Sequence, residues 1–152
     1  MLDIDTILDM LDWNNDIETQ EKGIEEGKKV RSLEAFIQPY HEKNSKAVWE
    51  NCAKILSCKN DEELWPHIRA LLHWLGDSNW PGYEIILDRL LKFQDLDWLG
   101  SVVKECVREA YILNDQKWLV DMQPITEHPG LGDHMPPIEF NLLKSACWEE
   151  EE

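Results

Sequence analysis

Residues 71–82, Leu-Leu-His-Trp-Leu-Gly-Asp-Ser-Asn-Trp-Pro-Gly, join two apolar segments through a polar corner. Apolar residues recur every three or four positions on both sides, which predicts one helix that ends near Leu75 and a second over residues 81–93. The corner offers side-chain oxygens for turns and caps, and a proline suited to a first helical turn. We therefore expect a structural corner between neighbouring helices, made by Trp74, Asp77, Asn79, Trp80 and Pro81.

The same helical spacing extends over most of the chain and predicts further helices over residues 3–11, 16–30, 33–37, 46–57, 97–113 and 118–122. Asn15, with Glu18 three residues later, has the pattern of a capping box for the second of these. No segment alternates apolar and polar residues as a strand does. The sequence therefore predicts an all-α fold, a HEAT-like array of antiparallel helix pairs, with an irregular helical bundle as the alternative.

Composition changes after Gln123, where four prolines and two glycines occur within fifteen residues. This change predicts a helical domain over residues 1–122, followed by an arm over residues 123–152 that packs on the same domain or trails from it. A chain of 152 residues suits one domain. The polar residues 40–44 are predicted to form a loop.

The charge of −16 is concentrated at the two ends of the chain. Residues 1–26 hold nine acids and one lysine, residues 109–152 hold ten acids and two lysines, and the middle is neutral. Such a field repels phosphate backbones, which disfavours nucleic-acid binding, and it suits a basic protein partner. Solubility alone is the competing explanation. The candidate partner-binding residues are the acids of the N-terminal helices, Asp3, Asp5, Asp9, Asp12, Asp16 and Glu18, together with the acids of the C-terminal arm.

No catalytic, phosphate-binding or zinc motif is present, so we expect neither enzyme activity nor a cofactor or metal. The four cysteines form no C-x-x-C pair and are predicted to be reduced thiols. His128, Asp133 and His134 cluster in the arm and carry a rival prediction, a small metal-dependent enzyme. The chain has no apolar membrane span and its first residues are acidic, so we predict a cytoplasmic protein without a membrane partner.

Residues 72–81 resemble the L-x-W-L-x-D-x-N-W-P signature of an uncharacterised bacterial domain family. The similarity extends from Asp61 to about Phe93, and Gly82-Tyr83 departs from the Val-Ala pair that often follows the proline in the family. The resemblance implies a small HEAT-like helical protein. It also implies a context, because some members lie near genes of polymorphic toxins and their immunity proteins. It transfers no catalytic residues.

These observations predict a non-enzymatic acidic protein-binding module. The most concrete form is an immunity protein that neutralises a basic toxin by occlusion. The alternative is a peptide-binding scaffold with a groove lined by exposed tryptophans.

Overall fold

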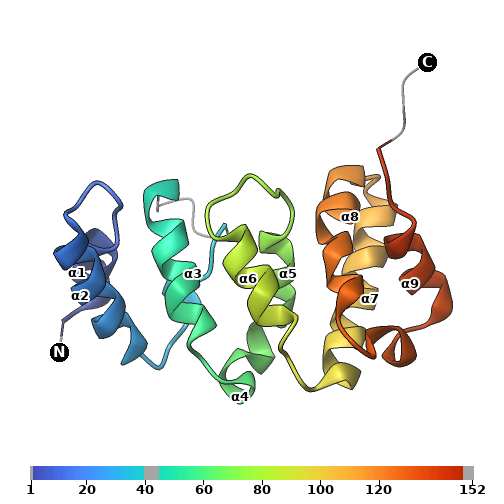
Figure 1. The fold of residues 1–152 in the computed structure, drawn as a ribbon, viewed down its shortest axis with the longest axis horizontal. Coiled ribbons are helices and arrows are strands. Elements are labelled where there is room, and N and C mark those ends of the chain that lie inside the picture. The colour runs from blue at the N-terminus through green and yellow to red at the C-terminus, as the bar shows by residue number, and fades with distance from the viewer. Residues whose placement is uncertain (1, 40–44, 149–152) are drawn as a thin grey trace.

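The computed structural model describes residues 2–39 and 45–148. These residues form helices and turns without any β-strand, which confirms the all-α prediction. The helices group in layers, and the layers follow one another along the long axis of the molecule from the N-terminus to the C-terminus (Figure 1). The loop predicted over residues 40–44 and the acidic end at 149–152 lie outside the described residues.

The α-helices are α1 Ile4–Met10, α2 Ile17–Lys28, α3 Trp49–Ser57, α4 Asp61–Leu64, α5 Ile68–Trp74, α6 Tyr83–Leu90, α7 Leu96–Ile112, α8 Gln116–Met122 and α9 Pro137–Lys144. Short 3-10 helices connect them: η1 Glu34–Phe36, η2 Lys46–Val48, η3 Trp65–His67, η4 Gln123–Glu127 and η5 Leu131–His134. Pro66 lies in η3, so the missing N–H of the proline falls between two α-helices instead of inside one.

Helices α2, α3 and α6 lie side by side and run in the same direction. Asn51 of α3 donates to Gln20 of α2, and Lys59, just beyond α3, donates to the carbonyl of Lys28 at the other end of α2. Arg89 of α6 reaches the Lys59 carbonyl in the same way. Since α5 follows α3 and leads back to the start of α6, it runs opposite to both. The described helices thus form a succession of reversing segments, and their HEAT-like character remains a prediction.

Acidic and amide side chains begin most of these helices. Asp3, Asp16, Asp95 and Asp115 each accept a hydrogen bond from the backbone N–H three residues later. Asn60 forms a full capping box with Glu63 at the start of α4. These caps satisfy N–H groups that have no partner inside the helix.

Two local predictions are wrong by one or two residues. Asn15 does not cap α2, because Asp16 does so, and the Asn15 amide instead donates to the carbonyls of Asp9 and Met10. The helix predicted over residues 81–93 begins only at Tyr83, so Pro81 precedes it. Gly82 has a φ of 86°, in the left-handed region that glycine tolerates, and this turn delays the helix start.

A single hydrophobic core runs through all the layers, from Ile7 in α1 to Leu143 in α9. Gly27 of α2 allows the close approach of α3, because a Cβ atom there would lie 2.3 Å from Ile55 Cδ1. The Cys52 and Cys106 thiols belong to this core, and burial raises the pKa of each to about 12. They therefore stay protonated and behave as small apolar residues.

The segment after Gln123 folds into η4, η5 and α9. It packs on α7, where Gly100 leaves room for the His134 carbonyl; a Cβ atom at Gly100 would lie 2.3 Å from that oxygen. Arg108 of α7 pairs with the buried Glu139 of α9 at 2.8 Å. The described part of the predicted arm is therefore held against α7 by both packing and an ion pair.

Candidate functional site

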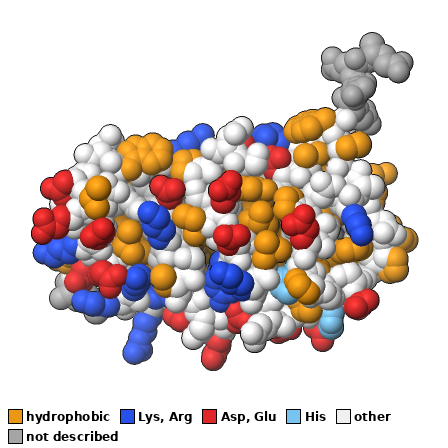
Figure 2. Space-filling model, viewed as in Figure 1, with side chains coloured by type: hydrophobic (Ala, Val, Ile, Leu, Met, Phe, Trp, Pro, Cys, Tyr) orange, Lys and Arg blue, Asp and Glu red, His pale blue; other side chains and the backbone are white. Residues whose placement is uncertain are grey.

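The predicted N-terminal acids lie on the surface of α1, α2 and the turn between them. Asp3, Asp5, Asp9, Asp16 and Glu18 are exposed and Asp12 is half-buried. Asp3 and Asp16 serve as caps, and hydrogen bonds from Thr6 and Thr19 hold the pKa of each carboxyl below its ordinary value. Acidic side chains gather over this end of the visible face, beside a few basic ones (Figure 2).

The remaining acids of this group have no ionic partner among the residues that the structure describes. Asp5, Asp9 and Glu18 enter none of the ion pairs found there, and Asp12 only accepts hydrogen bonds from Asn14. Lys28 and Lys29 pair with Glu25 and Glu26 farther along α2. The structure therefore leaves a negative surface on α1 and the start of α2.

The central corner is a structural junction. Trp74 is fully buried and its indole N–H donates to the Pro81 carbonyl at 3.0 Å, which closes the corner. Asp77 accepts from the Asn79 N–H at 2.8 Å, as in an Asx turn. Trp80 is half-buried and meets Trp49 edge to face, with 5.6 Å between ring centroids. All five predicted corner residues thus come together, while the Asn79 side chain is exposed.

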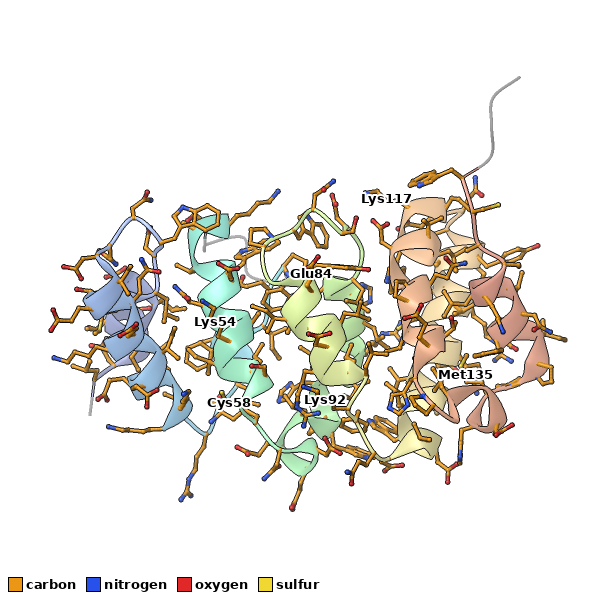
Figure 3. All side chains as sticks on the ribbon, in the orientation of Figure 1. Lys54, Cys58, Glu84, Lys92, Lys117 and Met135 are labelled. Carbon is orange, nitrogen blue, oxygen red and sulfur yellow. The ribbon has the colours of Figure 1, made fainter. Side chains whose placement is uncertain are left out.

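The corner is also anchored to α8 by a buried carboxylate. Asp121 accepts from the Ser78 N–H at 2.9 Å and from Lys117 Nζ at 2.8 Å, and its backbone carbonyl accepts from the Tyr83 hydroxyl. Burial raises the pKa of Tyr83 to about 12, so its hydroxyl remains a donor. Lys117 lies at the upper edge of the molecule, whereas Lys92 lies in its lower half (Figure 3).

His128, Asp133 and His134 do not share a site. His128 Nε2 lies 2.7 Å from the Phe93 carbonyl oxygen, and His134 Nδ1 lies 2.6 Å from Asp97 Oδ1. Within the described ranges, no three His, Cys, Asp or Glu side chains are placed to hold a metal ion. Each histidine therefore has a local partner on the α6–α7 connection or on α7.

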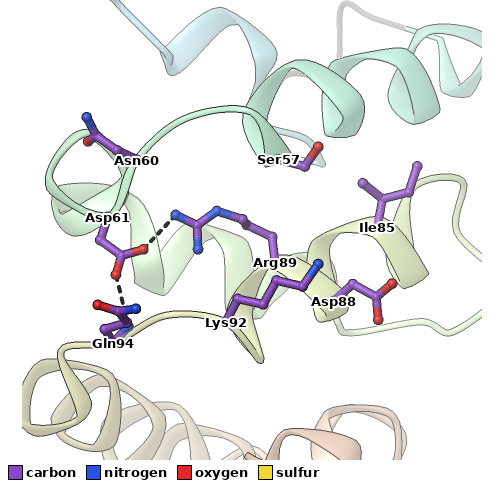
Figure 4. Close-up of a pocket in the computed structure, with 8 residues that line it drawn as sticks. All are labelled: Ser57, Asn60, Asp61, Ile85, Asp88, Arg89, Lys92 and Gln94. Atoms are coloured by element: carbon purple, nitrogen blue, oxygen red, sulfur yellow. Dashed lines mark hydrogen bonds and ion pairs between the residues drawn. The ribbon is translucent and has the colours of Figure 1, made fainter.

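A cleft of about 550 Å³ opens between the end of α3, the start of α4, and α6 (Figure 4). Arg89 crosses it, donates to the Lys59 carbonyl at 3.0 and 3.2 Å, and pairs with Asp61 at 2.6 Å. The second oxygen of Asp61 accepts from the Gln94 N–H at 2.9 Å. Arg89 and Asp61 are therefore committed to each other and to the backbone, and they clamp α6 to the α3–α4 turn.

Two tryptophans stack on the surface near Asp61, which lines both this cleft and the groove beside Trp65. Trp65 of η3 and Trp98 of α7 have ring centroids 3.9 Å apart and planes inclined by 12°. The indole N–H of Trp98 donates to the Trp65 carbonyl at 2.8 Å. Trp65 and Trp98 line different grooves, one of about 370 Å³ with Phe93 and one of about 350 Å³ with Val102. Periodicity cannot pair residues 33 positions apart, so the sequence prediction missed this stack.

A further surface lies between α5 and the end of α7. His73 stacks on Trp118 with 4.4 Å between ring centroids, and Trp118 donates to the Leu72 carbonyl at 3.0 Å. Glu109 pairs with Arg69 and lies 3.8 Å from His73 Nε2. Burial lowers the pKa of His73 and outweighs the nearby Glu109 carboxylate, so the neutral imidazole is favoured.

These features define an all-helical protein with one acidic end and an aromatic stack on its surface. The chain belongs to the family described as Domain of unknown function (DUF5071), whose model matches residues 44–128. The match is wider than the resemblance seen over residues 61–93, and it includes the corner, the cleft and the tryptophan stack but not α1 or α2. Curated proteins and solved structures yielded no match. None of the described helices has the length and apolar character needed to cross a membrane.

Proposed function

We propose that this protein is a non-enzymatic binding module for a basic protein, and that the acids of α1 and α2 make the first contact. The observation that carries the proposal is the exposed, unpaired state of Asp5, Asp9 and Glu18. The remaining charge of the chain does not offset them, because the total is −16.

Electrostatic attraction between an acidic surface and a basic partner mainly accelerates association. Long-range attraction raises encounter rates at low salt, and the effect weakens as salt screens the charges. A partner held by this end would be covered over part of its own basic surface. If the covered surface contains the partner's active site, binding alone blocks that site, and this chain needs no catalytic residue.

The immunity-type function is the most specific form of this proposal. Its support is the resemblance of residues 72–81 to a family with members near toxin and immunity genes, together with the acidic surface. The partner would then be encoded beside the gene for this chain. Occlusion would protect the cell from a toxin that acts on a phosphate-containing or otherwise anionic substrate, since such toxins carry basic active sites.

The test measures binding of the purified products of the two adjacent genes by surface plasmon resonance between about 50 and 300 mM salt. For a true partner, we expect the Asp5→Lys, Asp9→Lys double variant to associate about tenfold more slowly at low salt, with convergence at high salt. The matched control is Glu127→Lys with Asp133→Lys, the same charge change at exposed positions of the other end.

Two outcomes would contradict the proposal. One is that neither adjacent gene product binds at any salt concentration used. The other is that the control variant slows association as much as the N-terminal variant does. Thermal unfolding of both variants establishes that a lost signal reflects charge and not loss of the fold.

A further inference from the structure

The Trp65–Trp98 stack leaves an aromatic ring open to solvent. Trp65 is 43% exposed, whereas Trp98 is half-buried and fixed by its hydrogen bond to the Trp65 carbonyl. The stack explains how η3 is held on α7, since aromatic pairs in contact stabilise a fold beyond the burial of their surface. It does not explain why the exposed member is a tryptophan, the side chain with the most apolar surface to leave in water.

Two aromatic and three acidic residues line the groove beside Trp65. It has a volume of about 370 Å³, and it is lined by Asp61, Glu62, Trp65, Phe93 and Asp95. Phe93 is fully buried, so Trp65 supplies the exposed aromatic surface of the groove. Three carboxylates and no basic side chain line this space. A volume near the lower end of the range for ligand pockets suits one long side chain.

The three carboxylates are not equivalent. Asp61 is neutralised by Arg89, and Asp95 caps α7 by accepting from the Trp98 N–H at 3.1 Å. Glu62 is exposed, and its side chain makes no hydrogen bond or ion pair with any residue that the structure describes. Helix capping therefore accounts for Asp95 and the clamp for Asp61, while Glu62 is the carboxylate left for a ligand.

We infer that the groove formed by Asp61, Glu62, Trp65, Phe93 and Asp95 binds an arginine side chain of the basic partner. The guanidinium would stack on the exposed Trp65 ring and reach Glu62, while its aliphatic stem lies toward Phe93. Trp is the strongest cation–π partner among aromatic residues, and the planar guanidinium combines stacking with carboxylate contact. The inference rests on the proposed basic partner, but it places a specific anchor on a different surface, inside the region matched by the family.

The experiment titrates the full chain with N-acetyl-arginine methylamide and follows the ¹H–¹⁵N resonances of the tryptophan indoles. The matching citrulline derivative keeps the size and planarity of arginine but has no charge, and the lysine derivative keeps the charge without the plane. We expect saturable shifts of the Trp65 indole, with arginine bound about fivefold to tenfold more tightly than citrulline. One exposed cation–π contact and one exposed ion pair account for that ratio.

Two variants test the location. Trp65→Ala should abolish saturable arginine binding, followed at the Trp98 indole resonance, and Glu62→Lys should weaken arginine binding by about threefold or more. Trp13→Ala is the matched aromatic control, because Trp13 is 49% exposed at the other end of the molecule, and Glu127→Lys is the matched charge control. The remaining indole resonances report whether Trp65→Ala keeps the fold.

Equal binding of citrulline and arginine would overturn the inference, as would arginine binding that survives both Trp65→Ala and Glu62→Lys. Failure here is distinct from failure of the proposed function. If association of the partner depends on Asp5 and Asp9 but arginine does not shift the Trp65 indole resonance, only the inference about the groove fails. If arginine binds at Trp65 but no adjacent gene product binds the chain, only the proposed partner is excluded.

Discussion

The two ends of the chain carry the same net charge in the sequence, but the structure uses their acids differently. At the N-terminal end, Asp5, Asp9 and Glu18 point into solvent without an ionic partner among the described residues. At the C-terminal end, Glu109 pairs with Arg69, Asp121 with Lys117 and Glu139 with Arg108, whereas Glu127 and Asp133 are exposed and enter no ion pair with a described residue. The comparison shows that a charge count does not identify a binding surface.

The difference follows from burial. Glu139 is 6% exposed and Asp121 is 8% exposed, and a carboxylate so placed requires a basic partner or several hydrogen bonds. The acids of α1 and α2 are solvated and need neither. Acids that are already paired inside the fold contribute little to the field that a partner meets, so the N-terminal surface is the stronger candidate for steering.

The largest effect that tests this comparison is expected at the aromatic residues of the two ends. Trp118→Ala should lower the free energy of unfolding by about 3–5 kcal/mol, as other truncations of large core residues do. Trp118 is 4% exposed, stacks on His73 and donates to the Leu72 carbonyl, so its loss opens a cavity and removes both contacts. Urea unfolding monitored by circular dichroism measures the change.

Trp13→Ala is the paired measurement. Trp13 is 49% exposed beside α1, so its truncation should cost less than about 1 kcal/mol. Similar losses for Trp118→Ala and Trp13→Ala would mean that the C-terminal end is not the more tightly packed of the two.

The second prediction compares acids instead of tryptophans. Asp121→Ala should lower the free energy of unfolding by about 1–3 kcal/mol, because it leaves the Ser78 N–H without its acceptor and removes the nearer of the two carboxylates that pair with Lys117. The Lys117 side chain is 41% exposed, so water replaces part of the lost interaction. Asp9→Ala should stay within about 0.5 kcal/mol of the parent protein. A large loss for Asp9→Ala would show that the N-terminal acids are structural.

Helical periodicity predicted most of the fold because burial imposes it directly. The period predicted α7 over residues 97–113, and the helix runs over Leu96–Ile112. Errors arose where one residue of backbone geometry decides a boundary. Both Asn15 and Asp16 are good caps, and only the path of the chain selects Asp16. The late start of α6 depends on the left-handed turn at Gly82, which a sequence pattern for helices does not specify.

Candidate surfaces were less predictable, because they depend on contacts between distant segments. The acidic end was visible in the sequence, since charge is local. The Trp65–Trp98 stack, the Asp61–Arg89 clamp and the Asp121 anchor each join residues at least 28 positions apart. A single sequence contains no signal for such pairs. The histidines of the arm illustrate the reverse, because neighbours in the sequence bind to separate partners in the structure.

The smallest expected effect concerns pH and the His73–Trp118 contact at the C-terminal end of the core. Burial lowers the pKa of His73 in the folded protein, whereas the unfolded chain titrates near the ordinary value of about 6.5. Between these two pKa values the unfolded chain binds more protons, so the stability supported by neutral His73 is complete above about pH 6.5 and declines as the pH falls through that window.

His73→Phe keeps an aromatic ring on Trp118 and removes the titration. The decline in unfolding free energy from about pH 7.5 to pH 5.5 should therefore be shallower in the variant, by less than about 1 kcal/mol because the half-buried imidazole is partly screened by water. Urea unfolding at several pH values measures both slopes. A steeper decline in His73→Phe would mean that attraction of the protonated ring to Glu109, which approaches within 3.8 Å, outweighs burial.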